Sequence, residues 1–345
     1  MRIGLVARCD STGLGIQSKE FFDHIPCKAF VIDFSSMSPT QSFNEILKPH
    51  PEWYPGQKFF KWGNVHNSFG DVPLDLIYEF IQDIDILFFM ETPYDFNFFK
   101  ACNHKRVKTV LQFNYELLDY PSGFPSPSLF AAPSMWNYDL VPDPKIYLPV
   151  PVAAERFKPE PVRNTFIHIA GRPAMQDRNG THTFLNALRF VKNEITVIVK
   201  SQNGIRVPYT NKNIDLQVAC GNVNNYVDNY SGGVLVLPRK YGGLCLPINE
   251  AIAAGMPVIT TDISPNNLWL PKEWLVPSEH RGMIRSKKNF DYYEADPVKL
   301  AEKIDQFCDP QFYDEQYNRA LEIRETISWD ALRGLYDEKF EQLMK

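Results

Sequence analysis

Short runs rich in apolar residues recur along the chain, and most are bounded by glycine, proline or polar residues. Residues 234–237 (VLVL) form the clearest run, and the others are residues 2–7, 28–33, 86–90, 107–113, 129–133, 145–150, 165–170, 195–200, 214–219 and 258–261. Runs this short and this apolar are typical of strands buried on both faces of a parallel sheet. Helical spacing in intervening segments, such as residues 74–82, predicts helices between the strands. The alternation predicts an α/β protein.

A proline-rich segment, residues 149–161 (PVPVAAERFKPEP), interrupts this pattern near the middle of the chain. Such a composition is typical of a linker between domains, and 345 residues are enough for two α/β cores. We therefore predict two α/β domains, residues 1–150 and 151–326, followed by a C-terminal helix within residues 327–345.

The charge of the chain is mildly negative and unevenly distributed. There are 36 Lys and Arg against 41 Asp and Glu, for a formal net charge of −5, and residues 1–150 hold 12 of the basic and 17 of the acidic residues. The rest of the chain is therefore neutral. Neither half has the strongly basic composition that is usual for nonspecific nucleic-acid binding.

Cysteine placement and hydropathy indicate an intracellular protein. The six cysteines are scattered without a C-x-x-C pair, which indicates reduced thiols rather than disulfides or a zinc site. No apolar run approaches the ~20 residues of a membrane helix, and the N-terminal residues predict a strand rather than a signal peptide. We expect a cytoplasmic location.

Residues 234–261 contain the motif around which the second domain is organised. The strand at 234–237 leads to Gly242 and Gly243 and then to a helix with Pro247 near its first position. Gly255 and Pro257 end this helix before the strand at 258–261. A glycine turn that opens a helix presents free backbone N–H groups, which bind anions such as a diphosphate. From this pattern alone, a turn that only packs a crossover helix is the alternative.

Residues 243–259, GLCLPINEAIAAGMPVI, resemble the signature E-G-F-G-L-x-x-x-E-A-x-A-x-G-x-P-V-I of family-4-type, retaining glycosyltransferases of the GT-B fold. The resemblance implies two Rossmann-like domains that face each other across a cleft. It also implies that the C-terminal helix, with the residues SWDALRGLY, crosses back to the first domain. In this family Glu250 would accept hydrogen bonds from the donor ribose. The family's first glutamate falls on Gly242, so the identity of the transferred sugar stays open.

The same resemblance assigns further donor contacts. Residues 171–180 are similar to the family's G-R-x-x-x-x-x-K-G arrangement, which implies that Arg172 and Arg178 neutralise the donor diphosphate and take part in catalysis. Surface ion pairing is the alternative for both. The other donor-binding candidates are Gly13, Gly15, Gly171, Cys220, Gly221, Gly242, Gly243, Leu244, Cys245 and Leu246. For Gly13 and Gly15, which follow the first strand, a structural turn is the alternative.

Polar residues that follow first-domain strands are candidates for the acceptor site. Glu91 follows the strand at 86–90 and Glu116 follows the strand at 107–113, at the strand ends where α/β sheets bind ligands. Both are candidate acids. The acceptor-binding candidates are Asp10, Gln17, Lys58, Lys61, Trp62, His66 and Asn114. Four of these lie in a long irregular stretch that mixes charged and aromatic residues, which suits stacking on a sugar or a base, with an ordinary packed loop as the alternative.

The residues GLGIQ (13–17), ETPY (91–94) and RKYGGLCLP (239–247) resemble a variant subgroup of these glycosyltransferases carried by bacteriophages. The resemblance implies transfer of a hexose or pentose from a UDP-linked nucleotide sugar to an acceptor hydroxyl, with retention. It implies no metal or other cofactor, and a location in the host cytoplasm. No protein partner is predicted.

The acceptor expected first is a hydroxymethylated pyrimidine in phage DNA. A patch of Lys58, Lys61, Lys100, Lys105, Arg106 and Lys108 would contact the DNA. A surface glycan, a lipid-linked sugar or a small molecule is the alternative acceptor. From other classes, a sugar-nucleotide epimerase and an inactive sugar- or nucleic-acid-binding relative remain open.

Overall fold

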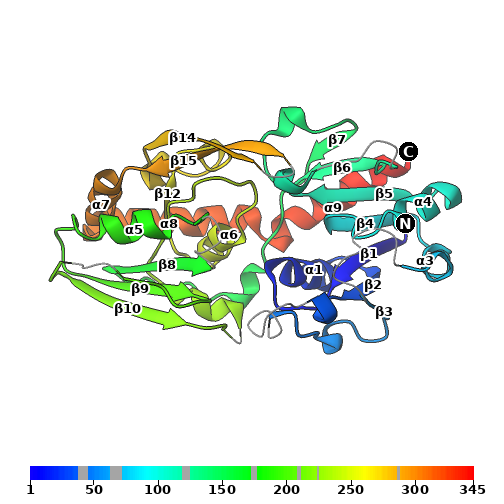
Figure 1. Cartoon of the computed structure of the whole chain (residues 1–345), viewed down its shortest axis with the longest axis horizontal. Coiled ribbons are helices and arrows are strands. Elements are labelled where there is room, and N and C mark those ends of the chain that lie inside the picture. The colour runs from blue at the N-terminus through cyan, green and yellow to red at the C-terminus, as the bar shows by residue number, and fades with distance from the viewer. Residues whose placement is uncertain are drawn as a thin grey trace. The chain divides into compact units, whose positions relative to one another are not determined.

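The chain divides into two units, drawn in Figure 1. The first consists of Met1–Val150 and Leu332–Lys345, and the second of Pro151–Ala331. The computed structural model describes residues 1–37, 46–62, 72–118, 125–171, 177–207, 211–223, 225–285 and 288–345.

The first unit is built on a seven-stranded parallel sheet of order β3-β2-β1-β4-β5-β6-β7. Its strands are β1 Ile3–Arg8, β2 Cys27–Asp33, β3 Lys58–Lys61, β4 Ile86–Glu91, β5 Lys108–Phe113, β6 Leu129–Ala132 and β7 Lys145–Tyr147. Its helices are α1 Gly13–His24, α3 Leu74–Ile81 and α4 Asn97–Lys105, together with α9 Trp329–Met344 from Leu332 onward. The strand order reverses between β1 and β4. Such a switch point is where open α/β sheets bind their ligands, beyond the carboxyl ends of the strands.

Aromatic side chains hold α9 on the first sheet. Phe88 of β4 stacks on Phe21 of α1, with ring centroids 4.6 Å apart, and meets Tyr336 and Phe340 of α9 at 6.3 and 5.8 Å. The Tyr336 hydroxyl donates to the Pro149 carbonyl oxygen at 3.0 Å. Burial of large aromatic rings stabilises such a contact, while the hydrogen bond satisfies the one polar group that is carried inside.

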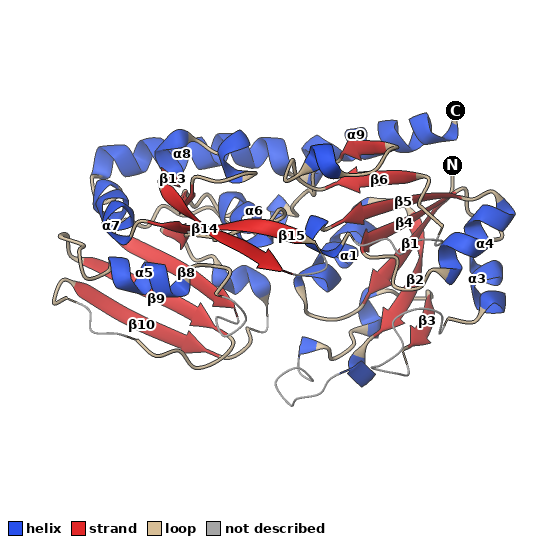
Figure 2. Cartoon of the chain, turned by 45° about the horizontal axis from the view of Figure 1, so that its top comes forward, coloured by secondary structure: helices blue, strands red, loops and turns tan. Residues whose placement is uncertain are grey.

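The second unit is built on a six-stranded parallel sheet of order β10-β9-β8-β11-β12-β13. Its strands are β8 Thr165–Gly171, β9 Ile195–Ser201, β10 Ile214–Cys220, β11 Val234–Leu237, β12 Val258–Thr261 and β13 Leu275–Val276. Its helices are α5 Thr181–Ala187, α6 Leu246–Ala253, α7 Pro297–Gln306 and α8 Pro310–Ile327. An antiparallel hairpin of β14 Ser278–Arg285 and β15 Asn289–Ala295 joins β13 to α7 (Figure 2).

The helices of the second unit cover both faces of its sheet. The crossover from β8 through α5 to β9 and the crossover from β11 through α6 to β12 run in opposite directions across the sheet. Since such crossovers are right-handed, α5 and α6 lie on opposite faces. The helix α7 packs against α5, and α8 packs against α6. The switch point of this sheet lies between β8 and β11.

The predicted strands agree closely with the structure in the second unit. The bounds of β11 and β12 are those predicted, and β8, β9 and β10 each extend one residue further. After Gly221 the described residues form a single 3-10 turn, Tyr226–Asn229, capped by Asn225.

Neither Thr181 nor Ser134 caps a helix, although both residue types favour N-cap positions. Thr181 is the first residue of α5, and its backbone N–H donates to the Asp177 carboxylate at 2.7 Å, so that Asp177 caps the helix. Ser134 caps no helix, since the 3-10 turn Tyr138–Leu140 follows Asn137 without a side-chain cap.

All six cysteines are free thiols, as the sequence predicts. Within the described part of the chain, no helix combines the length and the apolar character needed to span a membrane. In the same residues, no group of three or more His, Cys, Asp or Glu side chains is arranged to hold a metal ion. The expectation that the reaction needs no metal stays a prediction.

Buried His168 of β8 makes the stability of the second unit depend on pH. Its Nδ1 donates to the Val236 carbonyl oxygen at 2.7 Å, and its Nε2 lies 2.9 Å from Thr181 Oγ1. Burial lowers the pKa of His168 from 6.5 to about 4. Between these pH values the unfolded chain binds a proton that the folded chain does not, so the free energy of unfolding falls as the pH falls through this window.

Because of His168, we expect the free energy of unfolding to fall by about 3 kcal/mol as the pH falls from the unfolded-state pKa to the folded-state pKa. Urea unfolding of the wild type and of His168→Asn, measured across the window, tests it. The variant should lack this part of the pH dependence. Identical pH profiles for the two proteins would contradict the assignment to His168.

Candidate functional site

The loop between β11 and α6 forms the centre of the candidate donor site. It begins at the carboxyl end of β11, beside the switch point of the second sheet, and it ends at the first turn of α6, which contains Pro247. Gly242 has φ +115°, a conformation that L side chains rarely adopt. Gly242, Gly243 and Cys245 are buried, while Leu244 and Leu246 are partly exposed. The positive end of the α6 dipole therefore faces this tightly folded loop, which favours an anion there. Within the first turn of α6, Pro247 has no N–H, and the Ile248 and Asn249 N–H groups donate to the Cys245 carbonyl oxygen at 2.9 and 3.4 Å.

The turn that carries Arg178 is packed directly against this loop. The Arg178 carbonyl oxygen accepts a hydrogen bond from the Lys240 backbone N–H at 2.9 Å. Gly180, at φ +71°, approaches so closely that a Cβ would lie 2.1 Å from the Pro238 carbonyl oxygen. The turn before α5 and the loop before α6 are thus joined through their backbones. Gly171 ends β8 at φ +61°. Arg172 lies outside the described residues.

Two arginine side chains converge on Gly242. A Cβ there would lie 2.3 Å from Arg178 Nη2 and 2.4 Å from Arg239 Nη2. The Arg178 guanidinium also lies 5.3 Å from the centroid of the Tyr241 ring, and Arg239, only 5% exposed, donates to the Tyr241 carbonyl oxygen at 3.3 Å. The signature that this segment resembles has a glutamate at position 242. Here that place has no side chain, and two cations come close to it.

Lys240 joins three segments around the loop. Its ammonium group lies 2.7 Å from a Glu294 oxygen in β15 and 3.3 Å from an Asp177 oxygen in the turn before α5. Burial alone would lower the pKa of Lys240, but the hydrogen bonds and charges of Glu294 and Asp177 outweigh it and raise the pKa. The Tyr293 backbone N–H donates to the Lys240 carbonyl oxygen at 2.8 Å. Lys240 therefore has a structural role and holds the loop between the hairpin and the Arg178 turn.

The carboxylate of Glu250 is oriented by Tyr230. The Tyr230 hydroxyl donates to Glu250 Oε2, and the Tyr230 ring packs on Phe157 with ring centroids 5.8 Å apart. Burial and the charge of Glu250 raise the pKa of Tyr230, so the phenol stays protonated and keeps donating. Glu250 itself is partly exposed in α6. A partly exposed carboxylate held in one orientation suits the hydroxyl groups of a ribose.

Cys220 and Gly221 lie apart from the Gly242 loop. Both are exposed; Cys220 is the last residue of the edge strand β10 and Gly221 follows it, with β9 and β8 between β10 and β11. The Gly221 backbone N–H donates to the Ser201 carbonyl oxygen at the end of β9. They share the carboxyl edge of the sheet with the loop, and no described contact links them to Arg178 or Gly242.

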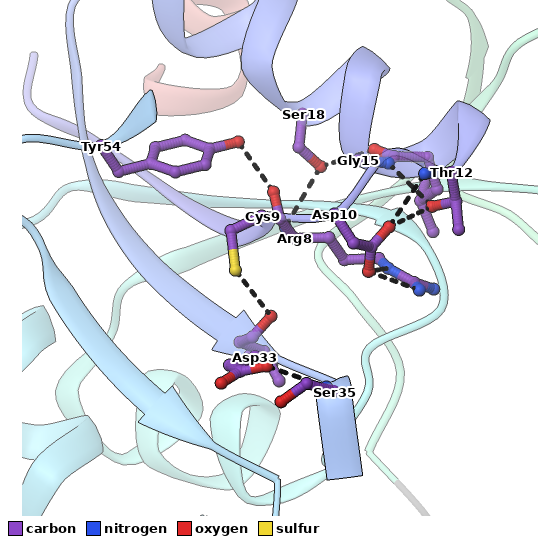
Figure 3. A network of polar contacts seen from close by, with 11 residues as sticks. Arg8, Cys9, Asp10, Thr12, Gly15, Ser18, Asp33, Ser35 and Tyr54 are labelled. Atoms are coloured by element: carbon purple, nitrogen blue, oxygen red, sulfur yellow. Dashed lines mark hydrogen bonds and ion pairs between the residues drawn. The ribbon is translucent and has the colours of Figure 1, made fainter. Parts of the chain in front are cut away.

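The turn after β1 forms a polar network around Asp10 (Figure 3). The Arg8 guanidinium donates to Asp10 Oδ2 at 2.9 and 2.7 Å, and the Thr12 backbone N–H donates to Oδ1 at 3.1 Å. Asp10 is 1% exposed. Gly15 is required by packing, because a Cβ would lie 1.9 Å from the Asp10 carbonyl oxygen. Gly13 is the first residue of α1. Packing alone therefore requires glycine at position 15, whether or not a ligand binds.

A second polar group lies at the ends of β4 and β5, beside the switch point of the first sheet. Asn114 Nδ2 donates to Glu91 Oε1 at 2.9 Å, and Glu116 is partly exposed in the 3-10 turn that follows Asn114. Glu91 and Tyr94 have φ values of +65° and +56°. Residues with side chains cost about 1–3 kcal/mol in such conformations, and they cluster at functional sites.

Tyr94 adds a buried hydroxyl to this group. Its oxygen has no hydrogen-bond partner among the described residues. Burial raises the pKa of Tyr94; the positive charge of Arg8 opposes the rise, and the charges of Glu91 and Asp10 add to it. A protonated phenol among two carboxylates and an arginine is suited to hydrogen bonding with hydroxyl groups.

Two predicted acceptor residues are part of the first unit's core. Gln17 Nε2 donates to Gln112 Oε1 at 3.0 Å, and Gln112 in turn donates to the Tyr336 hydroxyl of α9 at 3.1 Å. Trp62 is 2% exposed and packs on Phe34, with ring centroids 5.6 Å apart. The ring of this predicted stacking residue is therefore closed off from solvent. His66 lies outside the described residues.

The predicted basic patch is separated from the switch point. Lys58 and Lys108 are the first residues of β3 and β5, at the amino edge of the parallel sheet, and Lys105 ends α4 beside that edge. Lys58 pairs with Glu79, and the Lys105 ammonium lies 5.6 Å from the Tyr78 ring centroid. The exposed Lys61 ends β3 and is on the carboxyl edge. Most of the patch is thus on the edge opposite Glu91 and Asn114.

The sequence analysis did not single out four residues that organise these sites: Arg239, Tyr230, Asp177 and Tyr94. Arg239 carried a signal, since it follows a buried strand at the edge where ligands bind. Asp177 carried a weaker one, as an acidic residue shortly before a helix. Tyr94 carried the same signal as Arg239, because it stands in the segment ETPY after a buried strand. Tyr230 had no local signal, because its contact with Glu250 depends on tertiary packing.

The fold of the chain is similar to that of several solved structures. Sucrose-phosphate synthase from Thermosynechococcus elongatus has a TM-score of 0.65 at 12% identity, over 99% of this chain and 99% of that one. Anabaena HepE, solved in complex with UDP-glucose, has a TM-score of 0.65 at 11% identity, over 99% of this chain and 100% of that one. The chain has the GT-B fold.

A third GT-B match is the pneumococcal O-GlcNAc transferase GtfA, solved with UDP and GlcNAc. The TM-score is 0.52 at 12% identity, and the match covers 79% of this chain and 59% of the GtfA chain. No protein-family model and no curated protein sequence matches the chain. Identities this low establish the GT-B fold alone, so the activity has to be argued from the chain's own residues.

Proposed function

We propose that the chain is a nucleotide-sugar-dependent glycosyltransferase, which moves a sugar from a nucleoside diphosphate to an acceptor hydroxyl. The observation that carries the proposal is the convergence of Arg178 and Arg239 on Gly242, beside the N-terminus of α6. Glu250 lies on the same helix and is oriented by Tyr230. This combination offers cations for a diphosphate and a carboxylate for a ribose. The GT-B fold, which UDP-glucose-bound HepE shares, supports the proposal.

The proposed reaction breaks the bond between the anomeric carbon and the diphosphate oxygen and forms a bond to the acceptor oxygen on the same face of the sugar. Negative charge grows on the leaving diphosphate as its bond breaks. Guanidinium groups and the positive end of the α6 dipole, which are already in place, stabilise this charge in the transition state. The acceptor proton passes to the leaving phosphate oxygen. Retention follows in this scheme without a protein nucleophile and without a metal.

The acceptor side of the proposal rests on the first unit. Asp10, Glu91, Asn114 and Tyr94 lie at the carboxyl edge of β1, β4 and β5, around the switch point. Carboxylates, an amide and a phenol are groups that bind hydroxyls. We propose a retaining, family-4-like enzyme of the phage-carried subgroup, with a hydroxymethylated pyrimidine in DNA as the first acceptor to test. A surface glycan, a lipid-linked sugar or a small molecule is the alternative.

The position of the basic patch limits how DNA could bind. Since most of the basic patch lies on the opposite edge of the sheet, we propose contact with a single extruded or unpaired base rather than with an extended duplex. In that mode the affinity for unmodified duplex DNA is low.

A donor screen tests the proposed function. Nucleotide release is measured with UDP-, GDP-, ADP- and TDP-linked sugars, each with and without DNA that contains hydroxymethylcytosine. We expect one nucleotide class to be released, faster with the correct acceptor, and the acceptor to gain the mass of one sugar. An epimerase would isomerise the sugar without an acceptor, and a binding protein would consume no donor. Either outcome contradicts the proposal.

A further inference from the structure

The arginine pair at Gly242 includes one residue to which the resemblance assigns no role. Arg239 is the second residue after β11, on a loop, yet only 5% of it is exposed. Its guanidinium Nη2 and that of Arg178 both lie within 2.4 Å of the point that a Cβ of residue 242 would occupy. Two side chains from segments about sixty residues apart in sequence therefore bring their charged ends to one place.

The neighbouring cation shows what a purely structural role looks like in this loop. Lys240 is held between two carboxylates, Glu294 at 2.7 Å and Asp177 at 3.3 Å, and fastens the loop to β15 and to the Arg178 turn. Arg239 points to the other side, toward Gly242 and Arg178. Arg239 also contacts the loop backbone, through its hydrogen bond to the Tyr241 carbonyl oxygen at 3.3 Å, and in addition brings its guanidinium beside that of Arg178.

The absence of a side chain at Gly242 is what allows the pair to form. A methyl group would overlap the terminal nitrogens of both arginines. Those nitrogens are the far ends of flexible side chains, so the fold can accommodate the methyl group by moving them. Alanine would therefore disperse the two charges at little cost from steric overlap, although φ +115° adds backbone strain.

Two adjacent guanidinium groups match one kind of ligand best. Each guanidinium is planar and can donate two parallel hydrogen bonds to phosphate oxygens. A carboxylate has two oxygens and is matched by one such group, whereas two linked phosphates offer separate oxygens and a larger negative charge to both. We propose that Arg178 and Arg239 form a paired guanidinium subsite for the diphosphate of a nucleoside diphosphate, and that Gly242 is the position that makes room for it.

This inference rests on the proposed function, since it assigns the diphosphate of the same donor. The test compares nucleoside diphosphates with monophosphates by isothermal titration calorimetry, using the pairs UDP and UMP, GDP and GMP, and ADP and AMP. The wild type should bind the diphosphate of one pair more tightly than its monophosphate. Arg239→Gln should bind that diphosphate about 10- to 100-fold more weakly, the range for one lost charge-assisted contact, and should bind the monophosphate almost unchanged.

Two further variants make the result specific. Gly242→Ala retains both arginines and should lose the same preference for the diphosphate. In a protein that already carries Arg239→Gln, Gly242→Ala should weaken diphosphate binding less than it does in the wild type. Arg319→Gln, which removes a surface arginine paired with Glu322 on α8, should bind as the wild type does. Thermal unfolding without ligand shows which variants are folded, and Gly242→Ala carries the test alone if Arg239→Gln does not fold.

The outcomes separate the two proposals. A wild type that binds no diphosphate more tightly than its monophosphate contradicts the proposed donor site itself. A wild type with that preference, together with an unchanged preference in Arg239→Gln and in Gly242→Ala, leaves the donor site standing and overturns the paired subsite.

Discussion

Glu250→Ala is expected to lower kcat/KM for the nucleotide-sugar donor by about 30- to 1000-fold, a loss of about 2–4 kcal/mol of transition-state stabilisation. The Glu250 carboxylate is held by the Tyr230 hydroxyl and stays partly exposed in α6. By the family resemblance it accepts hydrogen bonds from the donor ribose. Without it, the sugar nucleotide loses a charge-assisted contact that positions the diphosphate at the arginine pair. Initial rates over a range of donor concentrations measure the effect.

Two controls define the role of this carboxylate. Tyr230→Phe keeps the aromatic contact with Phe157 and removes only the hydroxyl that orients Glu250. It should cost at most about tenfold in kcat/KM, as expected for one neutral donor. Glu322→Ala, on the surface of α8, should have no effect. An unchanged kcat/KM in Glu250→Ala would remove Glu250 from the donor site.

Gly180→Ala is expected to lower the free energy of unfolding of the second unit by about 3–5 kcal/mol. Its Cβ would lie 2.1 Å from the Pro238 carbonyl oxygen and 3.0 Å from the Pro238 carbonyl carbon. These are backbone atoms, so no side chain can move aside, and the turn before α5 has to separate from the β11–α6 loop. The residue also has φ +71°. The same shift would carry Arg178 away from Gly242, so nucleotide binding should weaken as well.

The matched control is Gly56→Ala. Gly56 has the same φ of +71°, and no atom lies within 4 Å of the position that its Cβ would occupy. Its substitution should cost about 1–2 kcal/mol, the cost of the backbone conformation alone. Urea unfolding of both variants, each compared with the wild type, gives the difference that the contact with Pro238 accounts for. Equal losses in the two variants would show that the contact is not what requires glycine at position 180.

The second unit was the more predictable half, for a local reason. Its central strands are apolar runs bounded by Gly and Pro, as at 232–238, and the helix that follows carries Pro247 at its start and Gly255 at its end. A strand that is buried on both faces of a sheet needs apolar residues throughout, and helix ends favour proline at the start and glycine after the last turn. Both requirements are local in the sequence. The bounds of β11 and β12 could therefore be read directly.

The candidate sites were predictable only in part. The carboxyl ends of strands identified Glu91 and Asn114, which contact each other in the structure. Gln17, beside the glycine turn after the first strand, and Trp62, in the irregular stretch that mixes charged and aromatic residues, were also predicted in the acceptor site, yet both are buried in the core of the first unit. A polar or aromatic residue in a loop has the same local pattern whether it faces a ligand or a neighbouring element.

The amino-acid sequence by itself determined that this protein is an α/β chain with a glycine turn at a helix N-terminus, because periodicity and turn residues act over a few positions. Only the tertiary structure decided which side chains meet: Arg178 with Arg239 at Gly242, Tyr230 with Glu250, and Gln17 with Gln112. Strand order brings these partners together across 20 to 95 residues of sequence, and no short-range pattern encodes that distance.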